Sequence, residues 1–245
     1  MTDYEPSTYG DAIADIYDEL HGWHLDTEAA VEALARLAGE GPVLELGVGT
    51  GRVAAPLAER GIEVHGIDAS EEMVSRLREK PGGDRVRVAA GDFAAVEAPA
   101  GAYSMVFVVF NTLFALASQD EQAGCFAGVA ERLAEDGVFV VEAFVPDLAR
   151  FDRGQRVDVT RVETGRVVLD VSMHDPVGQR VVSQHLIIED GRIRQVPVEL
   201  RYAWPSELDL MARLAGLRLR SRHGGWGEEP FTASSPRHVS VYERA

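Results

Sequence analysis

Short apolar runs alternate with segments of helical spacing through the middle of the chain. The apolar runs, which predict strands, lie at residues 43–47, 63–68, 85–89, 105–110 and 137–144. The segments between them that predict helices lie at residues 52–60, 70–80 and 118–134. Strands joined by crossover helices are typical of a parallel sheet with helices on both faces. The pattern therefore predicts an α/β protein with a doubly wound, mostly parallel sheet.

The pattern differs on either side of this central region. Residues 10–20 and 27–38 each place apolar residues on one helical face, which predicts two N-terminal helices. Residues 156–203 instead alternate at period two, with turn signals such as Asp190-Gly191 between the alternating stretches. This segment predicts an antiparallel β insert of three or four strands.

The C-terminal part of the chain returns to the pattern of the central region. Residues 205–214 have helical spacing, and residues 217–222 and 238–243 predict strands that pair as a hairpin at the sheet edge. The length of 245 residues suits one α/β domain with additions better than two full domains. The predicted parts are an N-terminal helical segment, a core, an antiparallel insert and a C-terminal helix with closing strands, at residues 1–41, 42–150, 151–204 and 205–245.

The composition argues against several classes of function. With 24 Lys and Arg against 40 Asp and Glu, the formal charge is −16, which disfavours sequence-independent binding of a nucleic-acid backbone. The one cysteine, Cys125, excludes an internal disulfide and a cysteine-based zinc site, and no H-x-x-x-H pair indicates another metal. No apolar run approaches the roughly 20 residues of a membrane span, and residues 1–5 lack the regions of a signal peptide. We therefore expect a cytoplasmic protein with no metal, no nucleic-acid partner and no membrane partner.

A glycine-rich turn follows the first predicted strand. Gly47, Gly49 and Gly51 allow positive φ and let a ligand approach the backbone closely. Their spacing differs from the dinucleotide fingerprint, and no Gly-Lys-Ser/Thr follows as in a phosphate-binding loop. Glu45, just before the turn, suits a cationic or amine-bearing ligand better than a pyrophosphate. The turn alone is weak evidence, because any nucleotide-binding turn has similar glycines.

Acidic residues follow the next two predicted strands. Asp68 ends the second strand 17 residues after Gly51, and an acid at this point typically accepts hydrogen bonds from ribose hydroxyls. Asp92 follows the third strand within Gly91-Asp92-Phe93. All of these sites fall at the carboxyl ends of neighbouring strands, where open α/β sheets bind ligands. The alternative is that these residues serve only the structure of the loops.

Taken as a set, four motifs resemble those of class I S-adenosylmethionine-dependent methyltransferases. They are residues 45–51, Asp68-Ala69-Ser70-x-x-Met73, Gly91-Asp92-Phe93 and Phe110-Asn111-Thr112, and the resemblance covers about residues 42–145. It implies a Rossmann-like core that binds S-adenosyl-L-methionine as its cofactor. The core residues that it assigns to the cofactor site are Glu45, Gly47, Gly49, Asp68, Ala69, Met73, Gly91, Asp92, Phe93, Phe110 and Asn111.

The resemblance also implies how these residues meet the cofactor. Gly47 and Gly49 would pass beneath its methionyl and ribose parts, with Glu45 near the methionyl amine. Asp68 would hold the ribose diol, and Asp92 would accept a hydrogen bond from the adenine amino group. The residues that would pack on the adenine or line the methionyl region are Ala69, Met73, Phe93, Phe110 and Asn111. For Met73 and Phe93, ordinary core packing is an equal alternative.

The flanking segments are similar to those of deoxyamino-sugar N-methyltransferases and their relatives in lincosamide antibiotic pathways. The N-terminal helices resemble a lid, and the insert is followed by Arg201-Tyr202-x-x-Pro205-x-Glu207-Leu208. The resemblance implies that Tyr17 reaches the cofactor carboxylate. Tyr9, eight residues earlier, would share its helical face and point into the same cavity if the helix extends that far. The alternative is that both tyrosines only pack the lid against the core.

One position departs from the sugar N-methyltransferases. They carry a histidine just past the fourth strand, where this sequence has Ala115, and we expect Phe114 to form an apolar wall near the methyl group instead. The weaker candidates for the substrate site are His21, His174, His185 and Trp226. The two histidines of the insert are weak because polar side chains on antiparallel strands usually face water, and Trp226 suits loop packing equally well.

The expected reaction is transfer of a methyl group to a small molecule. We predict an N-methyltransferase for an amino sugar or a lincosamide-like amine of antibiotic biosynthesis, with Tyr9, Tyr17 and Phe114 beside the reacting groups. An amine loses its proton to water or a modest base, whereas a hydroxyl needs a base more urgently, and the sequence shows no clear His–Asp dyad. The alternatives are an O-methyltransferase on a sugar or polyketide hydroxyl and, less favoured, a non-catalytic cofactor-binding module. The sequence leaves homo-oligomerisation open.

Overall fold

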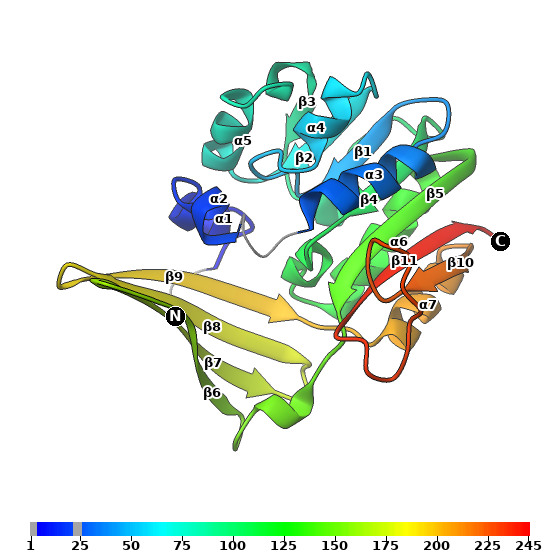
Figure 1. The fold of residues 1–245 in the computed structure, drawn as a ribbon. Coiled ribbons are helices and arrows are strands. Elements are labelled where there is room, and N and C mark those ends of the chain that lie inside the picture. Colours follow the sequence, from blue (N-terminus) through cyan, green and yellow to red (C-terminus); the bar gives the residue numbers. More distant parts are fainter. Residues whose placement is uncertain (1–3, 22–25) are drawn as a thin grey trace.

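The protein is built around two β-sheets, as Figure 1 shows. The computed structural model describes residues 4–21 and 26–245. The first sheet, here called the core sheet, has seven strands in the order β10-β11-β5-β4-β1-β2-β3. Its strands are β1 (Val43–Leu46), β2 (Val64–Asp68), β3 (Arg87–Ala90), β4 (Tyr103–Val108), β5 (Leu133–Phe144), β10 (Leu217–His223) and β11 (Arg237–Arg244). Strands β1 to β5 pair in parallel, and β11 pairs antiparallel with β5 and β10, which confirms the predicted doubly wound sheet and its edge hairpin.

Helices pack on both faces of the core sheet. They are α3 (Thr27–Leu37), α4 (Ala54–Glu59), α5 (Glu71–Arg78), α6 (Gln119–Arg132) and α7 (Pro205–Leu214), with 3₁₀ turns η1 (Gly83–Arg85), η2 (Phe93–Ala95), η3 (Thr112–Ala115) and η4 (Leu148–Arg150). Side-chain caps fix where two of the helices begin. Ser70 accepts a hydrogen bond from the Met73 amide at α5, and Ser118 and Glu121 form a reciprocal capping box at α6.

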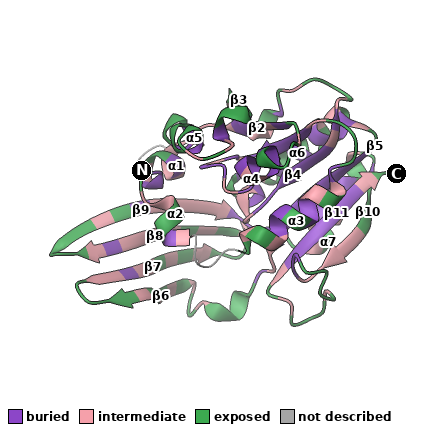
Figure 2. Ribbon diagram, turned by 45° about the horizontal axis from the view of Figure 1, so that its top comes forward, coloured by how far each residue is buried: buried purple, intermediate pink, exposed green. Residues whose placement is uncertain are grey.

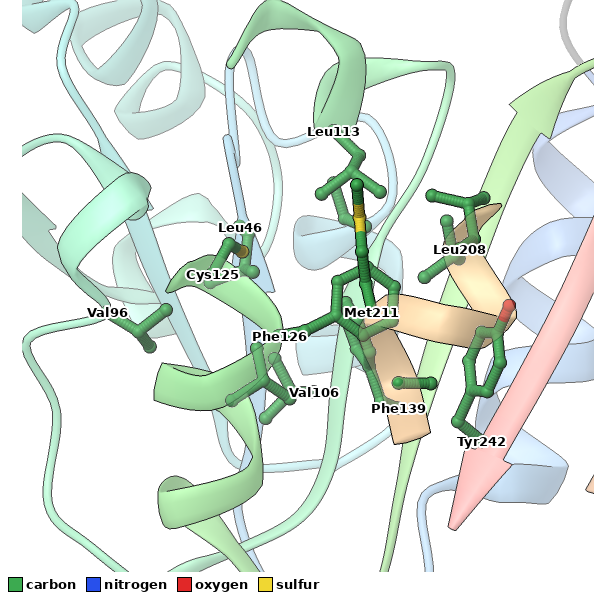
Figure 3. Close-up of a cluster of buried hydrophobic side chains, with 14 of the residues drawn as sticks. Leu46, Val96, Val106, Leu113, Cys125, Phe126, Phe139, Leu208, Met211 and Tyr242 are labelled. Atoms are coloured by element: carbon green, nitrogen blue, oxygen red, sulfur yellow. The ribbon is translucent and has the colours of Figure 1, made fainter. Parts of the chain in front are cut away.

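The core between the sheet and helices α6 and α7 is rich in aromatic side chains (Figure 3). Phe126 of α6 meets Phe139 of β5 edge to face, with ring centroids 5.1 Å apart, and both are fully buried. Met211 of α7 and Tyr242 of β11 complete this side. Helices α3, α4 and α5 bury their apolar side chains in a second core on the other side of the sheet. The strand ends that carry the candidate residues are therefore held by packing on both faces.

The second sheet is the predicted antiparallel insert, and it has four strands. These are β6 (Gln155–Glu163), β7 (Arg166–Asp175), β8 (Arg180–Glu189) and β9 (Arg192–Arg201), paired in sequence order. Its residues are mostly half-buried or exposed, in contrast to the buried central strands β1 and β4 of the core sheet (Figure 2). The register places Asp170 directly opposite His185, and Ser172 opposite Ser183. These four side chains lie on the face that turns toward the core sheet.

The N-terminal segment forms two short helices rather than the single helix predicted over residues 10–20. They are α1 (Thr8–Ile13) and α2 (Tyr17–His21), and the turn between them is tight because the Ile16 amide donates to the Ile13 carbonyl. We call residues 8–21 the lid. Gly10 lets α1 lie directly on the start of α5, since a Cβ there would come within 2.6 Å of the Ser70 Cβ. Residues 1–3 and 22–25 of the predicted N-terminal segment lie outside the described residues.

Polar contacts hold the lid to both sheets. The Ser70 hydroxyl donates to Asp11 at 2.6 Å, and Lys80 pairs with Asp18 at 2.6 Å. On the opposite side, Arg194 of β9 pairs with Asp15 at 2.6 Å. The lid therefore bridges the core sheet and the second sheet, as Figure 1 shows. Over the part of the chain that the structure describes, no helix is long and apolar enough to cross a membrane.

Candidate functional site

A cavity lies where the core sheet, the lid and the second sheet meet. Its volume is about 500 Å³, and residues from all three parts line it. The core contributes the loops after β1 to β4, which carry the glycine-rich turn and the predicted acidic residues. The lid contributes Tyr9, Tyr17 and His21, and the second sheet contributes its inner face. Side chains far apart in sequence thus converge at the carboxyl edge of the parallel strands.

The glycine-rich turn needs its glycines for conformation and for space. Gly47 lies at φ 69°, and a Cβ there would come within 2.4 Å of the Thr112 methyl carbon. The Gly49 amide donates to Asp68 Oδ2 at 2.7 Å, and the Ser70 amide donates to Asp68 Oδ1 at 2.9 Å. Burial raises the pKa of the Asp68 carboxyl. Each of its oxygens keeps a further lone pair, so this carboxylate suits a ligand with neighbouring hydroxyl groups.

Glu45 is a buried carboxyl group with an unsatisfied oxygen. Its side chain is 2% exposed, and among the described residues Oε2 has no hydrogen-bond partner. Burial raises its pKa to about 8, although the positive charge of the nearby Arg52 guanidinium lowers it in part. Glu45 does not line the cavity, but its charge acts on Asp68 and on Tyr17, which do. A cationic ligand group beside it would supply the missing partner, and the residues present therefore fit a cofactor that carries both an ammonium group and a ribose.

The loops after β2 and β3 form the next part of the wall. Ala69, Met73, Asp92 and Phe93 line the cavity, whereas Gly91 does not. Asp92 Oδ1 already accepts a hydrogen bond from the Ala94 amide at 2.8 Å, which orients the carboxylate at the start of η2. Met73 is 4% exposed and belongs to a buried apolar cluster, and it also lines the cavity, so it has both a packing role and a place in the wall.

The exit of β4 bends sharply into the cavity. Phe110 and Asn111 have φ values of 52° and 65°, an unusual conformation for residues other than glycine. Asn111 Oδ1 accepts from the Phe144 amide at 2.7 Å, and the Phe110 amide donates to Glu142 Oε2 at 2.9 Å. These bonds hold the bend, and both Phe110 and Asn111 line the cavity.

The bend also places Phe114 away from the cavity, in contrast to the predicted apolar wall near the methyl group. Phe114 is fully buried in the core, where its ring meets Phe144 with centroids 5.0 Å apart. The wall is formed instead by Ala115, Leu116 and Phe144 itself. The 3₁₀ turn η3, which begins after the left-handed Asn111, is responsible, because it points Phe114 inward and its neighbour Ala115 outward.

The two lid tyrosines surround a histidine. The Tyr9 hydroxyl lies 3.0 Å from His21 Nε2, and the Tyr17 and His21 rings have centroids 4.9 Å apart. Burial raises the pKa of Tyr9 well above its ordinary value, and burial raises that of Tyr17 to about 12. Both phenols therefore keep their protons at neutral pH. His21 in turn meets Phe110 edge to face at 5.4 Å, which links the lid to the bend after β4.

The second sheet contains a His–Asp pair that the sequence analysis did not find. His185 Nδ1 and Asp170 Oδ1 are in hydrogen-bond contact, and both side chains line the cavity. The expectation that no such dyad exists was wrong, because the pair forms only through the register of β7 against β8. His174 does not line the cavity: its Nε2 lies 2.9 Å from the Tyr202 hydroxyl and its ring stacks on Phe151.

Trp226 packs in the protein and does not close the cavity. It is 3% exposed, and its Nε1 donates to Glu142 Oε1 at 3.0 Å. Sequence reasoning also missed a set of cavity-lining carboxylates, namely Glu5, Glu121, Asp147, Asp158 and Glu199. Over residues 4–21 and 26–245, no group of three or more His, Cys, Asp or Glu side chains is placed to hold a metal ion.

Comparison with known proteins identifies this architecture. Residues 43–137 match the family described as "Methyltransferase domain". The chain is similar to the cypemycin N-terminal methyltransferase of a Streptomyces species, with 31% identity over 205 residues that cover 82% of each protein. It is also similar in structure to the CcbJ methyltransferase from Streptomyces caelestis, with 46% identity and a TM-score of 0.93 over 99% of this chain and 100% of that one.

A more distant structure shares the fold. DesVI of Streptomyces venezuelae matches with a TM-score of 0.70 and 23% identity, over 95% of this chain and 98% of that chain. The full-length similarity to CcbJ includes the lid and the second sheet as well as the core. The match to the cypemycin methyltransferase covers 82% of each protein. Together with the cavity geometry and the matching domain family, it places the chain in a known family. The protein belongs to the class I S-adenosylmethionine-dependent methyltransferases.

Proposed function

We propose that this methyltransferase transfers a methyl group to a nitrogen of a small natural-product intermediate, an amino sugar or a lincosamide-like amine. The observation that carries the proposal is the charge of the cavity wall. Among the described residues, eight carboxylate side chains and one guanidinium, that of Arg150, line it. Such a wall attracts an ammonium group and disfavours an anionic acceptor. The relative that methylates an N-terminus, as its name states, supports the same choice.

The cofactor half of the cavity is proposed to comprise the residues at the strand ends. Glu45 would accept from the methionyl ammonium, and Asp68 from the ribose diol. Gly47 and Gly49 would run beneath the ligand, since both line the cavity and both have positive φ. The remaining proposed contacts are Tyr17, Ala69, Met73, Gly91, Asp92, Phe93, Phe110 and Asn111. Gly91 would act only through its backbone, since it does not line the cavity.

The lid contributes alignment and exclusion of water to the reaction. When bound, S-adenosylmethionine supplies a methyl group on a positively charged sulfur that is already reactive toward nucleophiles. Tyr9 and Tyr17 keep their protons and so act as hydrogen-bond donors that orient the acceptor and the cofactor. Holding two reactants in line contributes about 7–11 kcal/mol to lowering the barrier. The lid, fastened to both sheets through Asp11, Asp15 and Asp18, keeps competing water out.

We propose a division of labour that follows the four predicted parts. Residues 1–41 would close the site, residues 42–150 would bind the cofactor, and residues 151–204 would hold the acceptor. Residues 205–245 complete the core sheet. In support, the strand ends that suit the cofactor and the sheet face that bears the polar side chains line the same cavity.

One observation favours a second candidate, an O-methyltransferase on a sugar or polyketide hydroxyl. A hydroxyl must lose its proton to a base as it attacks, and the Asp170–His185 pair is a base of that kind on the cavity wall. The carboxylate-rich wall outweighs this observation, because it gives an uncharged hydroxyl no advantage.

The test is to locate the methyl group in the product. Purified protein is incubated with S-adenosylmethionine and three probes that each carry an amine: L-prolinamide, the methyl glycoside of an aminodeoxyhexose, and a tripeptide with a free N-terminus. The aminodeoxyhexose carries amine and hydroxyl groups in one molecule, so carbon–nitrogen correlation in its NMR spectrum decides between them. We expect the new methyl on nitrogen. A methyl on oxygen would overturn the proposal in favour of the second candidate.

A further inference from the structure

The inner face of the second sheet carries a polar row that faces the lid. Asp170 on β7 and His185 on β8 are directly opposed, and the next position in the row is the apolar Val196 on β9. Asp170 is 27% exposed and His185 is 21% exposed at the side chain, and both open onto the cavity. The pair is therefore accessible to a molecule in the cavity, yet sheltered by the sheet and the lid.

Hydrogen bonding fixes which nitrogen of His185 meets the cavity. An ionised carboxylate only accepts hydrogen bonds, so contact with Asp170 assigns the ring proton to Nδ1. Nε2 then carries a lone pair. Among the described residues, no hydrogen bond reaches this Nε2. In the neutral ring this bare nitrogen can accept a proton, and the carboxylate behind the ring stabilises the resulting charge.

The other groups around His185 do not suit the same task. Tyr9 of α1, whose ring centroid lies 6.4 Å from that of His185, keeps its proton because burial raises its pKa. The ring centroid of His21 of α2 lies 6.5 Å from that of His185, and its Nε2 is already in hydrogen-bond contact with the Tyr9 hydroxyl at 3.0 Å. Val196 of β9 is apolar. Asp170 is the carboxylate in contact with His185, and Asp158, opposite Asp170 on β6, pairs with Arg150 and Arg156. His185 remains as the proton acceptor.

We propose that His185 takes the proton from the methyl acceptor and that Asp170 is the positioning residue that orients and stabilises it. The inference rests on the proposed function, in which an amine occupies this half of the cavity. The ammonium N–H bond breaks, its electron pair stays on nitrogen, and the proton moves to His185 Nε2. The nitrogen lone pair then forms the N–C bond as the methyl–sulfur bond breaks and its electron pair stays on sulfur. The positive charge of the sulfur ends on the methylated nitrogen, and the imidazolium returns its proton to water.

This assignment changes the expected dependence of rate on pH. If the acceptor binds as an ammonium and a neutral His185 removes its proton, the rate is flat between the titration of the imidazole and that of the amine, and it falls above the latter. Without such a base, only the free amine reacts, and the rate rises about tenfold per pH unit until the amine is deprotonated. The two cases differ most near pH 7.

The test compares three variants with the wild type across pH, with the amine probes named above. We expect His185→Gln to reduce kcat/KM about 100-fold near pH 7, with the deficit shrinking as pH rises toward the pKa of the amine. Asp170→Asn should show the same trend with a smaller deficit. His174→Gln is the matched control: it removes a histidine from the same sheet outside the cavity wall, and its ratio to wild type should not vary with pH. Circular dichroism and thermal melting confirm that each variant folds.

A second readout does not depend on turnover or on the identity of the acceptor. In protein labelled with ¹⁵N in histidine, the His185 signals, assigned by their loss in His185→Gln, should show protonated Nδ1 and bare Nε2. Asp170→Asn should remove this tautomer preference. A ring with Nε2 protonated and Nδ1 bare, or a His185→Gln deficit that stays constant with pH, would overturn the proposal. If the methyl is found on oxygen, the proposed function fails. The role of His185 is still supported in that case if the fall in rate at low pH seen in the wild type disappears in His185→Gln.

Discussion

Asp68 offers the sharpest test of the cofactor site, because its two oxygens already have defined partners. They accept from the Gly49 amide at 2.7 Å and from the Ser70 amide at 2.9 Å, which fixes the carboxylate where a ribose diol would meet it. A hydrogen bond to a charged group contributes about 1.5–3 kcal/mol. We therefore expect Asp68→Ala to weaken binding of S-adenosylhomocysteine about 10- to 150-fold in isothermal titration calorimetry.

The structure adds a complication that the experiment must separate. Asp68→Ala also leaves the Gly49 and Ser70 amides without partners, so part of the loss reflects a loosened turn. Asp68→Asn keeps one carbonyl oxygen for an amide and isolates the loss of charge. As a matched control, Asp158→Asn changes a carboxylate of the same cavity on the second sheet and should leave this affinity unchanged. Wild-type affinity in a folded Asp68→Ala protein would refute the assignment.

Four further predictions concern the cofactor site and the reaction. Because burial raises the pKa of Glu45 to about 8, cofactor binding near pH 7 should release up to about one proton, measured by calorimetry in buffers of different ionisation enthalpy, and Glu45→Gln should abolish the release. The pKa of Glu45 in the folded protein lies above its unfolded value of 4.5, so protonated Glu45 contributes fully to folding stability below pH 4.5, and this contribution is lost as the pH rises to about 8. In urea melts across that pH window, the stability of Glu45→Gln should rise relative to wild type by about 1.4 kcal/mol per pH unit. Tyr17→Phe should mainly weaken cofactor binding and Tyr9→Phe should mainly lower kcat, each by about 2- to 12-fold for one lost hydrogen bond; unchanged kinetics in both would show that they only pack the lid. Activity should survive exhaustive chelation, and recovery of a lost activity by added Mg²⁺ or Zn²⁺ would contradict a metal-free reaction.

Local patterns were sufficient to predict most of the elements. Helix α7 spans Pro205–Leu214 as its spacing predicts, and the Ser118 and Glu121 capping box opens α6. The acidic residues at the ends of β2 and β3 were also predictable, because the carboxyl ends of neighbouring parallel strands lie at the same edge of the sheet. Burial and capping are properties of short segments, so the sequence alone carries them.

The features that sequence reasoning missed depend on contacts between segments. The break between α1 and α2 interrupts an apolar face that is continuous in the sequence. The direction of Phe114 follows from the left-handed conformation of Asn111, which a residue pattern does not specify. The Asp170–His185 pair follows from the register of the β7–β8 hairpin, in which Asp175 faces Arg180. Five positions further from that turn, the same register pairs Asp170 with His185. The position of the turn therefore carried the information needed to predict the pair.

A crystal structure of the complex with S-adenosylhomocysteine tests the central claim most directly, namely that cofactor and acceptor meet in the cavity between the two sheets. We expect the ribose hydroxyls on Asp68, the amine beside Glu45, and the sulfur directed toward the side of the cavity lined by Tyr9, His21 and His185. A ligand bound elsewhere, or a sulfur directed away from these three residues, would contradict it.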